Sequence, residues 1–447
     1  MKKDSRRARE RKWWDSSHAS LCLLGGYLRR IGFFQPLEEQ VHLRQKVRRY
    51  TPVQKLEMLF VSLLAGAKAV SQTGSTLRVD PALQGAFGLP GCAEQSVLAD
   101  TLNAATAADV AALRTVVETS WQTYSAIRRH DFTREILVLD LDLSPLPASR
   151  RAEGSERGYM GRYRSKTGRK LVRVRAAASQ ETLWEEVAPG RTVEALAVVQ
   201  QAVTAVERLL GMEEETPATG ARRARIEWRL DSGWGGEETI NWLLARGYQV
   251  TGKFKAYSRV QKLVRPITTW EPTTSPGREV APVPEPVTLA RSCAPYAVRT
   301  PSKDKPGGYY HAVLFTSRTD LGMQAVVTHY DARAGMEADL KSDKRGLGLG
   351  VIRKQKLPAQ QMVVLLGQWA HNVLLWARRW LARGAPRLEC FGIVRLVQQV
   401  CAVPGRVKLT AAGVSRVRLR REHPCARDVY RGLRPFCPSS HTLGFLG

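Results

Sequence analysis

Residues 135–142 read Glu-Ile-Leu-Val-Leu-Asp-Leu-Asp, and this stretch decides the fold that the sequence predicts. An apolar run of this length that ends in Asp140 and Asp142 is typical of a buried strand followed by a turn. Residues 225–231, Arg-Ile-Glu-Trp-Arg-Leu-Asp, repeat the pattern and end at Asp231. Two core strands that stop at carboxylates predict an acidic site at one edge of a sheet.

A further carboxylate lies on a helix that we predict at residues 329–344. Tyr330, Arg333, Glu337 and Lys344 follow one another at intervals of three, four and seven residues. At about 100° per residue, these offsets place all four side chains on one narrow stripe of a helix. A carboxylate between two cations can hold a divalent metal and grip phosphate oxygens. The same composition also occurs on solvated, ion-paired helix faces, so the stripe alone does not decide between the two interpretations.

The order Asp, Asp, Glu, with the glutamate embedded in Tyr-x2-Arg-x3-Glu-x6-Lys, resembles the DDE transposases of bacterial insertion sequences that carry a YREK signature. Residues 229–233, Arg-Leu-Asp-Ser-Gly, also resemble the segment around the second aspartate of that family, with Trp234 in place of the more usual Phe or Tyr. The resemblance implies that the catalytic, metal-binding carboxylates are Asp142, Asp231 and Glu337. Asp140 stays open as the alternative to Asp142.

The resemblance also implies the chemistry of the site. Two divalent ions, Mg²⁺ or Mn²⁺, would be bound by the three carboxylates. Arg333 and Lys344 would hold phosphates, and Tyr330 would contact a phosphate beside the scissile bond. Trp270 is a candidate for stacking on an unpaired DNA base, and a packing role is the alternative for it.

Composition agrees with a nucleic-acid partner. The chain has 447 residues, with 69 Lys and Arg against 41 Asp and Glu, for a formal net charge of +28. Such an excess favours a polyanion, most simply double-stranded DNA, although it also fits a ribosomal or membrane-surface protein. The seven cysteines show no CxxC spacing, which predicts neither a disulfide framework nor a zinc site. We expect a bacterial cytoplasmic protein that joins the nucleoid when bound to DNA, with no membrane association.

The chain divides by pattern into an α/β core of RNase H-like type, interrupted by a β-rich insertion, with a helical region before it. The helical region has a basic arm at residues 1–12 and a helix-turn-helix-like start near residue 94. The predicted segments are a helical N-terminal DNA-binding region at 1–130, the first part of the core at 131–255, the insertion at 256–312, the second part of the core with the catalytic helix at 313–385, and a basic C-terminal region at 386–447.

Periodicity predicts the individual elements of these segments. Helices are expected at 54–70, 94–102, 107–126, 191–211, 236–246 and 358–382. Strands are expected at 135–142, 170–178, 182–188, 223–231, 248–255 and 313–318, with a hairpin at 406–420.

These observations predict a cut-and-paste DNA transposase that binds terminal inverted repeats, cleaves the transposon ends and joins the 3′ ends to target DNA by two-metal phosphoryl transfer. By family analogy, a homodimer would pair two ends. Two rival hypotheses are an RNase H-like nuclease without strand transfer and a catalytically inactive DNA-binding derivative. Inverted repeats in the DNA that flanks the coding sequence would favour the transposase.

Overall fold

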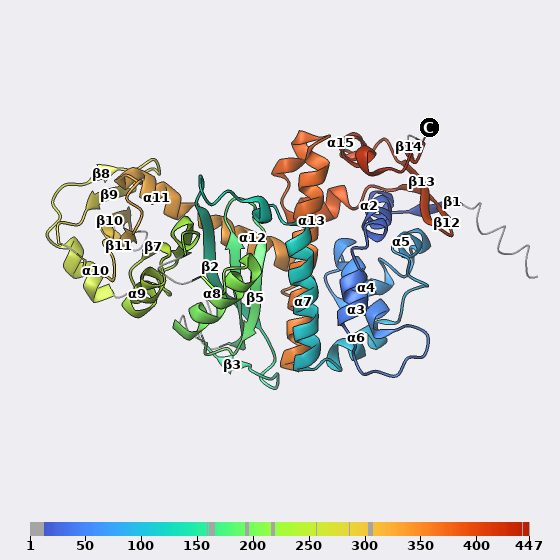
Figure 1. The fold of residues 1–447 in the computed structure, drawn as a ribbon, viewed down its shortest axis with the longest axis horizontal. Helices are drawn as coiled ribbons and strands as arrows, with labels where there is room; N and C mark the ends of the chain where they lie inside the picture. The colour runs from blue at the N-terminus through green and yellow to red at the C-terminus, as the bar shows by residue number, and fades with distance from the viewer. Residues whose placement is uncertain are drawn as a thin grey trace, which may run out of the picture. The chain divides into compact units, whose positions relative to one another are not determined.

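The computed structural model describes residues 13–158, 160, 166–192, 196–215, 220–255, 257–285, 287–302, 307–439 and 441–446. The predicted basic arm at residues 1–12 lies outside the described residues. The chain forms two compact units, which we describe separately (Figure 1). The helical unit comprises Met1–Ser125, Leu146–Arg169 and Asp339–Gly447, and the sheet unit comprises Ala126–Pro145 and Lys170–Ala338.

The helical unit is built mainly of α-helices. They are α2 (Ala19–Arg30), α3 (Gln35–Gln40), α4 (Pro52–Leu64), α5 (Pro81–Ala86), α6 (Gln95–Asn103), α7 (Ala107–Tyr124), α13 (Leu357–Ala382), α14 (Ile393–Arg395) and α15 (Ala426–Leu433). Single helical turns lie at η1 (Val70–Gly74), η4 (Pro386–Cys390), η5 (Leu396–Val400) and η6 (Arg434–Phe436). The strands are β1 (Trp13–Ser16), β3 (Glu156–Arg157), β12 (Gly405–Thr410), β13 (Gly413–Leu419) and β14 (Leu443–Phe445).

Local sequence explains where the helices of this unit begin. At α4, Thr51 accepts a hydrogen bond from the N–H of Gln54, whose side chain accepts one from the N–H of Thr51 in return, and Pro52 occupies the first helical position. The long helix α13 is apolar on nearly every side and packs against α7, α4, α6 and α15. Figure 1 shows α7 lying along α13. Among the described residues, no helix combines the length and the apolar character that crossing a membrane requires.

A small sheet joins the two ends of the chain in the order β1-β12-β13-β14. Trp13 and Trp14 lie in β1, where they pair with Lys408 and Val407 of β12. The predicted hairpin at 406–420 is confirmed as β12 and β13, and Val417 and Leu419 of β13 are buried.

The sheet unit contains one long sheet with helices on both faces. Its strands are β2 (Leu137–Pro147), β4 (Thr167–Ala176), β5 (Thr182–Ala188), β6 (Ile226–Leu230), β7 (Gln249–Lys253), β8 (Glu271–Pro272), β9 (Glu279–Pro282), β10 (Ala294–Pro301) and β11 (Tyr309–Thr316). Its helices are α8 (Leu196–Leu210), α9 (Glu237–Ala245), α10 (Tyr257–Val264) and α11 (Met323–Asp331), with single turns η2 (Ile127–Arg129) and η3 (Arg223–Arg225). Helix α12 (Ala334–Gly346) begins in this unit and ends in the helical unit.

The strand order of this sheet places the acidic segments side by side. From one edge to the other it runs β5-β4-β2-β6-β7-β11-β10-β9-β8, and β3 pairs with the start of β4. Strands β2, β6 and β7 are parallel, and Asp140 of β2 lies beside Arg229 of β6. Strand β11 pairs antiparallel with β7, so the strands of the predicted insertion extend the same sheet.

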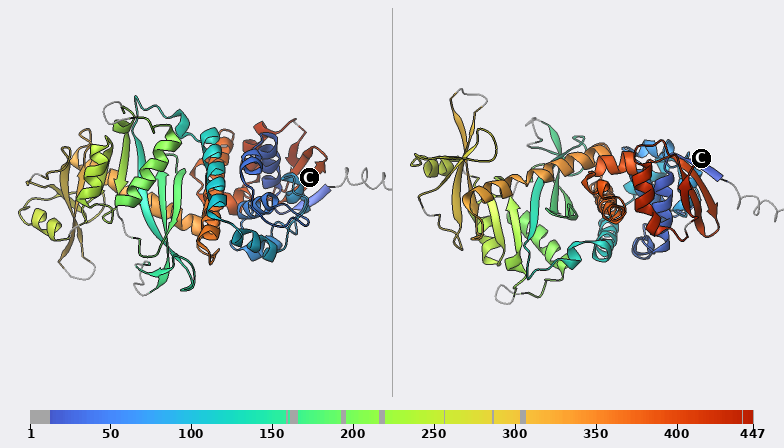
Figure 2. Two further views of the ribbon diagram at one scale, coloured as in Figure 1. Left: turned by 60° about the horizontal axis from the view of Figure 1, so that its bottom comes forward. Right: turned by 90° about the horizontal axis from the view of Figure 1, so that it is seen from above.

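The two faces of the sheet carry different side chains because residues alternate along a strand. Trp228 and Leu230 are fully buried, on the face that α8 and α9 cover, whereas Arg229 points to the face under α11. Figure 2, seen from above, shows α11 on the opposite side of the sheet from α8.

Several predicted elements differ from the structure, and among them the helix predicted at 54–70 ends at Leu64. The predicted strand at 135–142 continues to Pro147, so Asp142 lies inside β2 and not at its end. Its ladder with β6 nevertheless stops at Leu141, one residue earlier. The single helix predicted at 329–344 is wrong, because the chain turns at residues 332 and 333 between α11 and α12.

Candidate active site

The candidate site is built on charged residues that alternate with apolar ones along β2 and β6. Leu139 and Leu141 are fully buried in the core of the sheet, so Asp140, which lies between them, and Asp142, which follows, share the opposite face. On β6, Arg229 shares that face. The pairing register therefore gathers acidic and basic side chains from two neighbouring strands on one surface.

Asp140 is the most deeply buried member of this group. Its side chain has no exposed surface, and it accepts hydrogen bonds from Arg229 Nε at 2.7 Å and Nη2 at 2.9 Å. Arg175 Nη1 lies 3.3 Å from the same carboxylate. Arg229 also donates to the carbonyl oxygen of His329 at 2.6 Å, which ties β6 to the end of α11. Both oxygens of Asp140 are thus engaged by buried guanidinium groups.

Asp142 lies closer to the surface and is paired with a different cation. Arg333 Nη2 donates to Asp142 Oδ1 at 2.9 Å, and 17% of the Asp142 side chain is exposed. Burial raises the pKa of the Asp142 carboxyl above its ordinary value. The charge of Arg333 opposes this rise, and the charges of Asp231 and Glu337 add to it. Asp231 and Glu337 therefore lie near enough to Asp142 to affect the ionisation of its carboxyl.

Asp231 follows β6 and lies in a turn that close packing fixes. The N–H of Trp234 donates to the carbonyl of Asp231 at 3.0 Å, and the Trp234 side chain is buried. A Cβ on Gly235 would lie 1.9 Å from the carbonyl oxygen of Lys253, so only glycine fits at that position. Tyr330 donates its hydroxyl to Asp231 Oδ1 at 3.3 Å. Burial raises the pKa of Tyr330, and the charge of Asp231 adds to the rise, which keeps the phenol protonated.

The break between α11 and α12 explains how Tyr330 and Arg333 both reach the strands. The N–H groups of Arg333, Gly335 and Met336 each bond to the carbonyl three residues earlier, which is a tighter turn than an α-helix makes. Arg333 is consequently turned inward and only 6% exposed. The four residues therefore do not share one stripe of a single helix. Instead, Tyr330 contacts Asp231 and Arg333 contacts Asp142.

Glu337 and Lys344 both lie on α12 but differ in their surroundings. Glu337 is exposed in the first turn, in the sheet unit. Lys344 is in the last turn, in the helical unit, and its role stays a prediction. Within the part of the chain that the structure describes, no three His, Cys, Asp or Glu side chains are already arranged as a metal-binding group.

A second buried network beside the site was not predicted from the sequence. Glu227 of β6 is fully buried, with His329 Nε2 at 2.7 Å and Arg318 Nη1 at 3.1 Å from its oxygens. Burial raises the pKa of Glu227, but the hydrogen bonds from these partners outweigh it and the net pKa is lowered. The signal in the sequence is the alternation of charged and apolar residues through 227–231, which would be unusual in a strand buried on both faces.

Trp270 lies outside this group, on the part of the sheet formed by the predicted insertion. Its ring packs on the guanidinium of Arg299, whose Cζ is 4.6 Å from the ring centroid. The same guanidinium lies 4.5 Å from the centroid of Tyr309. Trp270 is half-buried, so it has a packing role in the structure, and its stacking on a DNA base stays a prediction.

Two neighbouring strands present Asp142 and Asp231 to Tyr330 of α11 and to Arg333 of the turn before α12, which makes the chain a candidate DDE-type enzyme of DNA. The chain belongs to the transposase DDE domain group 1 family, whose family model matches residues 15–434. DNA transposition is the activity of that class. No curated protein matches the chain in sequence.

Matches among solved structures include two transposase complexes. One is a cryo-EM structure of the piggyBac transposase synaptic complex with hairpin DNA, at 10% sequence identity and a TM-score of 0.48, covering 88% of this chain and 83% of that chain. The other is the crystal structure of a pre-cleavage Mos1 transpososome, at 15% identity and a TM-score of 0.18, covering 46% of this chain and 60% of that chain. The family membership rests on the sequence match alone.

Proposed function

We propose that the chain is a cut-and-paste DNA transposase that cleaves transposon ends and joins the 3′ ends to target DNA. The observation that carries the proposal is the meeting of Asp142 with Arg333 and of Asp231 with Tyr330, in a chain of the DDE family. The strand order β5-β4-β2-β6-β7 supports an RNase H-like core, because three successive strands are followed by two parallel strands that alternate with helices.

Asp142, Asp231 and Glu337 fit a pair of divalent ions by their chemistry. Carboxylate oxygens are the ligands that Mg²⁺ and Mn²⁺ prefer, and the charges of Asp231 and Glu337 add to the rise in the pKa of Asp142, which supports their closeness to Asp142. Bound ions would activate a hydroxyl nucleophile and stabilise the leaving oxygen. Asp140 is the weaker candidate for a ligand, since two buried arginines already occupy its oxygens.

The basic side chains of the site would act on the DNA backbone. Arg333 is held on β2 by its hydrogen bond to Asp142 and would transfer this hydrogen bond to a phosphate oxygen. Tyr330 stays protonated and would donate to a phosphate beside the scissile bond. Lys344 would neutralise charge on the same strand, and Trp270 would stack on an unpaired base through the part of its ring that Arg299 leaves uncovered.

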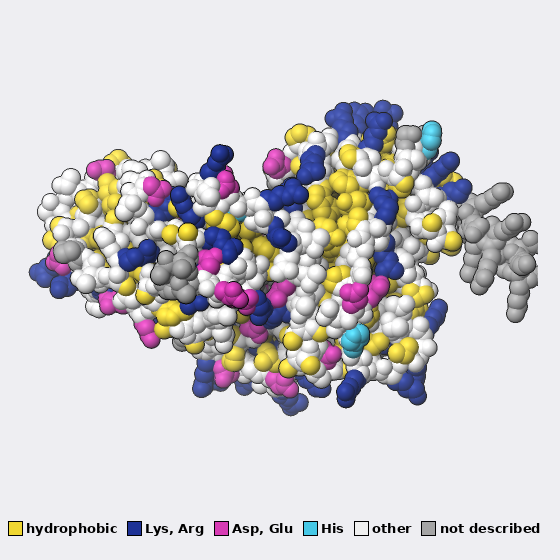
Figure 3. Space-filling view, in the orientation of Figure 1, with side chains coloured by type: hydrophobic (Ala, Val, Ile, Leu, Met, Phe, Trp, Pro, Cys, Tyr) yellow, Lys and Arg dark blue, Asp and Glu magenta, His cyan; other side chains and the backbone are white. Residues whose placement is uncertain are grey.

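DNA recognition would fall to the helical unit. The C-terminal region carries exposed Arg427, Arg431 and Arg434, and Figure 3 shows Lys and Arg side chains gathered over α15. Exposed arginines of this kind bind phosphates through counterion release. By family analogy, two copies of the chain would pair two transposon ends, and the protein would act in the bacterial cytoplasm at the nucleoid.

The test is cleavage of labelled DNA that carries the ends of the element, with Mg²⁺ or Mn²⁺ and a target duplex. We expect cleavage and joining by the wild type, and loss of both in Glu337→Ala with end binding retained. Glu238→Ala, which changes an exposed glutamate on α9, is the matched control and should keep full activity. Cleavage without joining would point to a nuclease. Equal activity of Glu337→Ala and wild type would refute the assignment of the site.

A further inference from the structure

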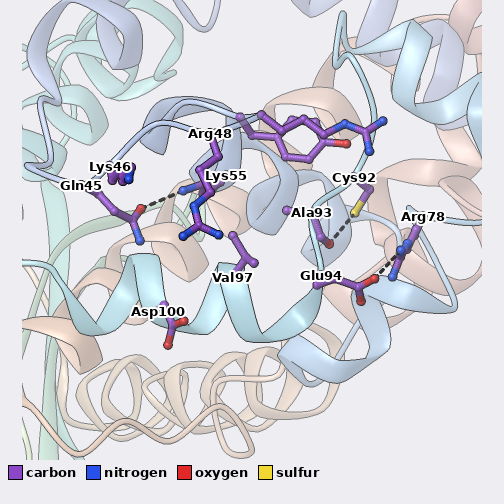
Figure 4. A pocket seen from close by; sticks show the side chains of 12 residues that line it. Gln45, Lys46, Arg48, Lys55, Arg78, Cys92, Ala93, Glu94, Val97 and Asp100 are labelled. Carbon is purple, nitrogen blue, oxygen red and sulfur yellow. Dashed lines mark hydrogen bonds and ion pairs between the residues drawn. The ribbon is translucent and has the colours of Figure 1, made fainter.

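A basic cavity of about 560 Å³ lies in the helical unit, beside α6. Five cationic residues line it, and only two acidic ones do, one of which already forms an ion pair with a lining arginine. The cations are Lys46, Arg48, Arg49, Lys55 and Arg78, and the acids are Glu94 and Asp100. Figure 4 shows the ends of Arg48 and Lys55 on the same side of α6, close to Gln45 and Lys46.

The chain segment that supplies most of this charge is held in place. Gln45 Oε1 accepts a hydrogen bond from Lys55 Nζ at 2.9 Å and from the Thr101 hydroxyl at 2.9 Å. These bonds tie the segment to both α4 and α6, while Lys46 and Arg48 next to Gln45 stay exposed. The positive charges are therefore preorganised along one wall of the cavity.

Lys55 is the cation of this wall whose surroundings most favour binding of an anion. Its residue is only 4% exposed, and its hydrogen-bond acceptor Gln45 is neutral. Among the described residues, no carboxylate lies within ion-pair distance of the Lys55 ammonium; Asp100 acts on it only at longer range. A buried ammonium without an ion-pair partner is costly, and an anion that enters the cavity would offset this cost.

We propose that this cavity binds the phosphate backbone of duplex DNA, outside the unit that carries Asp142. The proposal rests on the proposed function, which makes DNA the partner, and it names the surface that holds the DNA. Lys46 and Arg48 contact successive phosphates from the rim, and Lys55 meets one phosphate at the wall. The contacts are made to the backbone and so do not depend on base sequence.

Counterion release sets the expected size of the effect. Each phosphate contact contributes about 0.9 to the slope of the logarithm of affinity against the logarithm of salt concentration, so at about 0.1 M salt one contact is worth about eightfold in affinity. Lys55→Met should therefore weaken DNA binding about eightfold and lower the slope by about 0.9. Its melting temperature should change little, because the lost hydrogen bond to Gln45 is offset by removal of a buried charge without an ion-pair partner, and Thr101 still donates to Gln45.

The experiment measures fluorescence anisotropy of full-length protein with a labelled duplex of the transposon end and with a scrambled duplex, over a range of salt concentrations. Lys46→Ala/Arg48→Ala changes only exposed residues, and it should weaken binding of both duplexes by about sixtyfold at about 0.1 M salt. Lys68→Met, an exposed lysine outside the cavity lining, should bind like the wild type.

Unchanged affinity and slope in Lys55→Met and in the double variant would overturn the inference and leave the proposed function intact. A loss confined to the transposon-end duplex would also overturn it, because the contacts would then read bases. A wild-type protein that binds neither duplex would refute the proposed function itself.

Discussion

Asp140→Asn is the substitution that tests our interpretation of the buried network most directly. It removes the carboxylate charge that pairs with Arg229 and Arg175, while both guanidinium groups stay at most 4% exposed. The asparagine side chain keeps one oxygen that accepts a hydrogen bond from Arg229, and an NH₂ group replaces the second accepting oxygen. Removing one partner of a buried ion pair costs about 3–5 kcal/mol in the free energy of unfolding. At a urea dependence of about 3 kcal/mol per M, a loss of about 4 kcal/mol lowers the unfolding midpoint by about 1.3 M.

The assay is urea unfolding followed by tryptophan fluorescence, because Trp228 is fully buried in the strand that carries Arg229. The matched control is Asp320→Asn, which weakens the ion pair between Asp320 and Arg318. The Asp320 side chain is 59% exposed. Exposed pairs contribute at most about 1 kcal/mol, so this midpoint should scarcely move. An Asp140→Asn protein as stable as the control, with lost Mn²⁺ binding, would refute the reasoning and make Asp140 the first metal ligand.

Three further predictions follow from other groups. Burial raises the pKa of Glu57 to about 7, so the folded chain holds a proton that the unfolded chain releases above about pH 4.5, and the stability of the wild type falls as pH rises from about 4.5 to 7. The melting temperature of Glu57→Gln should therefore exceed that of the wild type at pH 8 and equal it at pH 4. Superimposable melting curves of the two proteins at both pH values would contradict this. Arg333→Gln should tighten Mn²⁺ binding in the absence of DNA, measured by calorimetry, because the cation paired with Asp142 competes with a metal; unchanged affinity would show that no such competition exists. Trp270→Ala should reduce the fluorescence change that a 2-aminopurine at the cleavage point shows when the protein binds the DNA. An unchanged signal together with a lower melting temperature would mean that Trp270 only packs on Arg299 and does not stack on a base.

The sequence predicted the strands that carry or precede the candidate aspartates because the signals of those strands are local. The apolar run that ends at Asp142 and the turn composition after Asp231 both depend on neighbouring residues. The break between Tyr330 and Arg333 was missed because inward pairing with two different aspartates decides it, and helical periodicity contains no information on such partners. Glu227 was missed for a similar reason, since its burial depends on a histidine more than a hundred positions away.

Pairing between distant strands was also beyond local patterns. The proline-rich stretch predicted as a separate insertion contributes strands to the main sheet through the contact of β11 with β7. Pairing of strands that are far apart in the sequence must offset the entropy lost when the chain between them is closed into a loop. Whether two strand edges fit well enough to do so cannot be read from a short stretch of sequence.

The continuity of β7, β11, β10 and β9 restricts how this protein can evolve or be engineered. Val280, Val298 and Leu314 of the added strands form one apolar cluster with Val327 of α11, and Tyr330 packs against it. A shortened version without residues 256–312 would expose the edge of β11 and leave Tyr330 without its support, which invites aggregation. Variation in length among relatives should therefore be tolerated in the connecting loops and not in the strands, and domain-exchange experiments should transfer residues 256–312 together with α11.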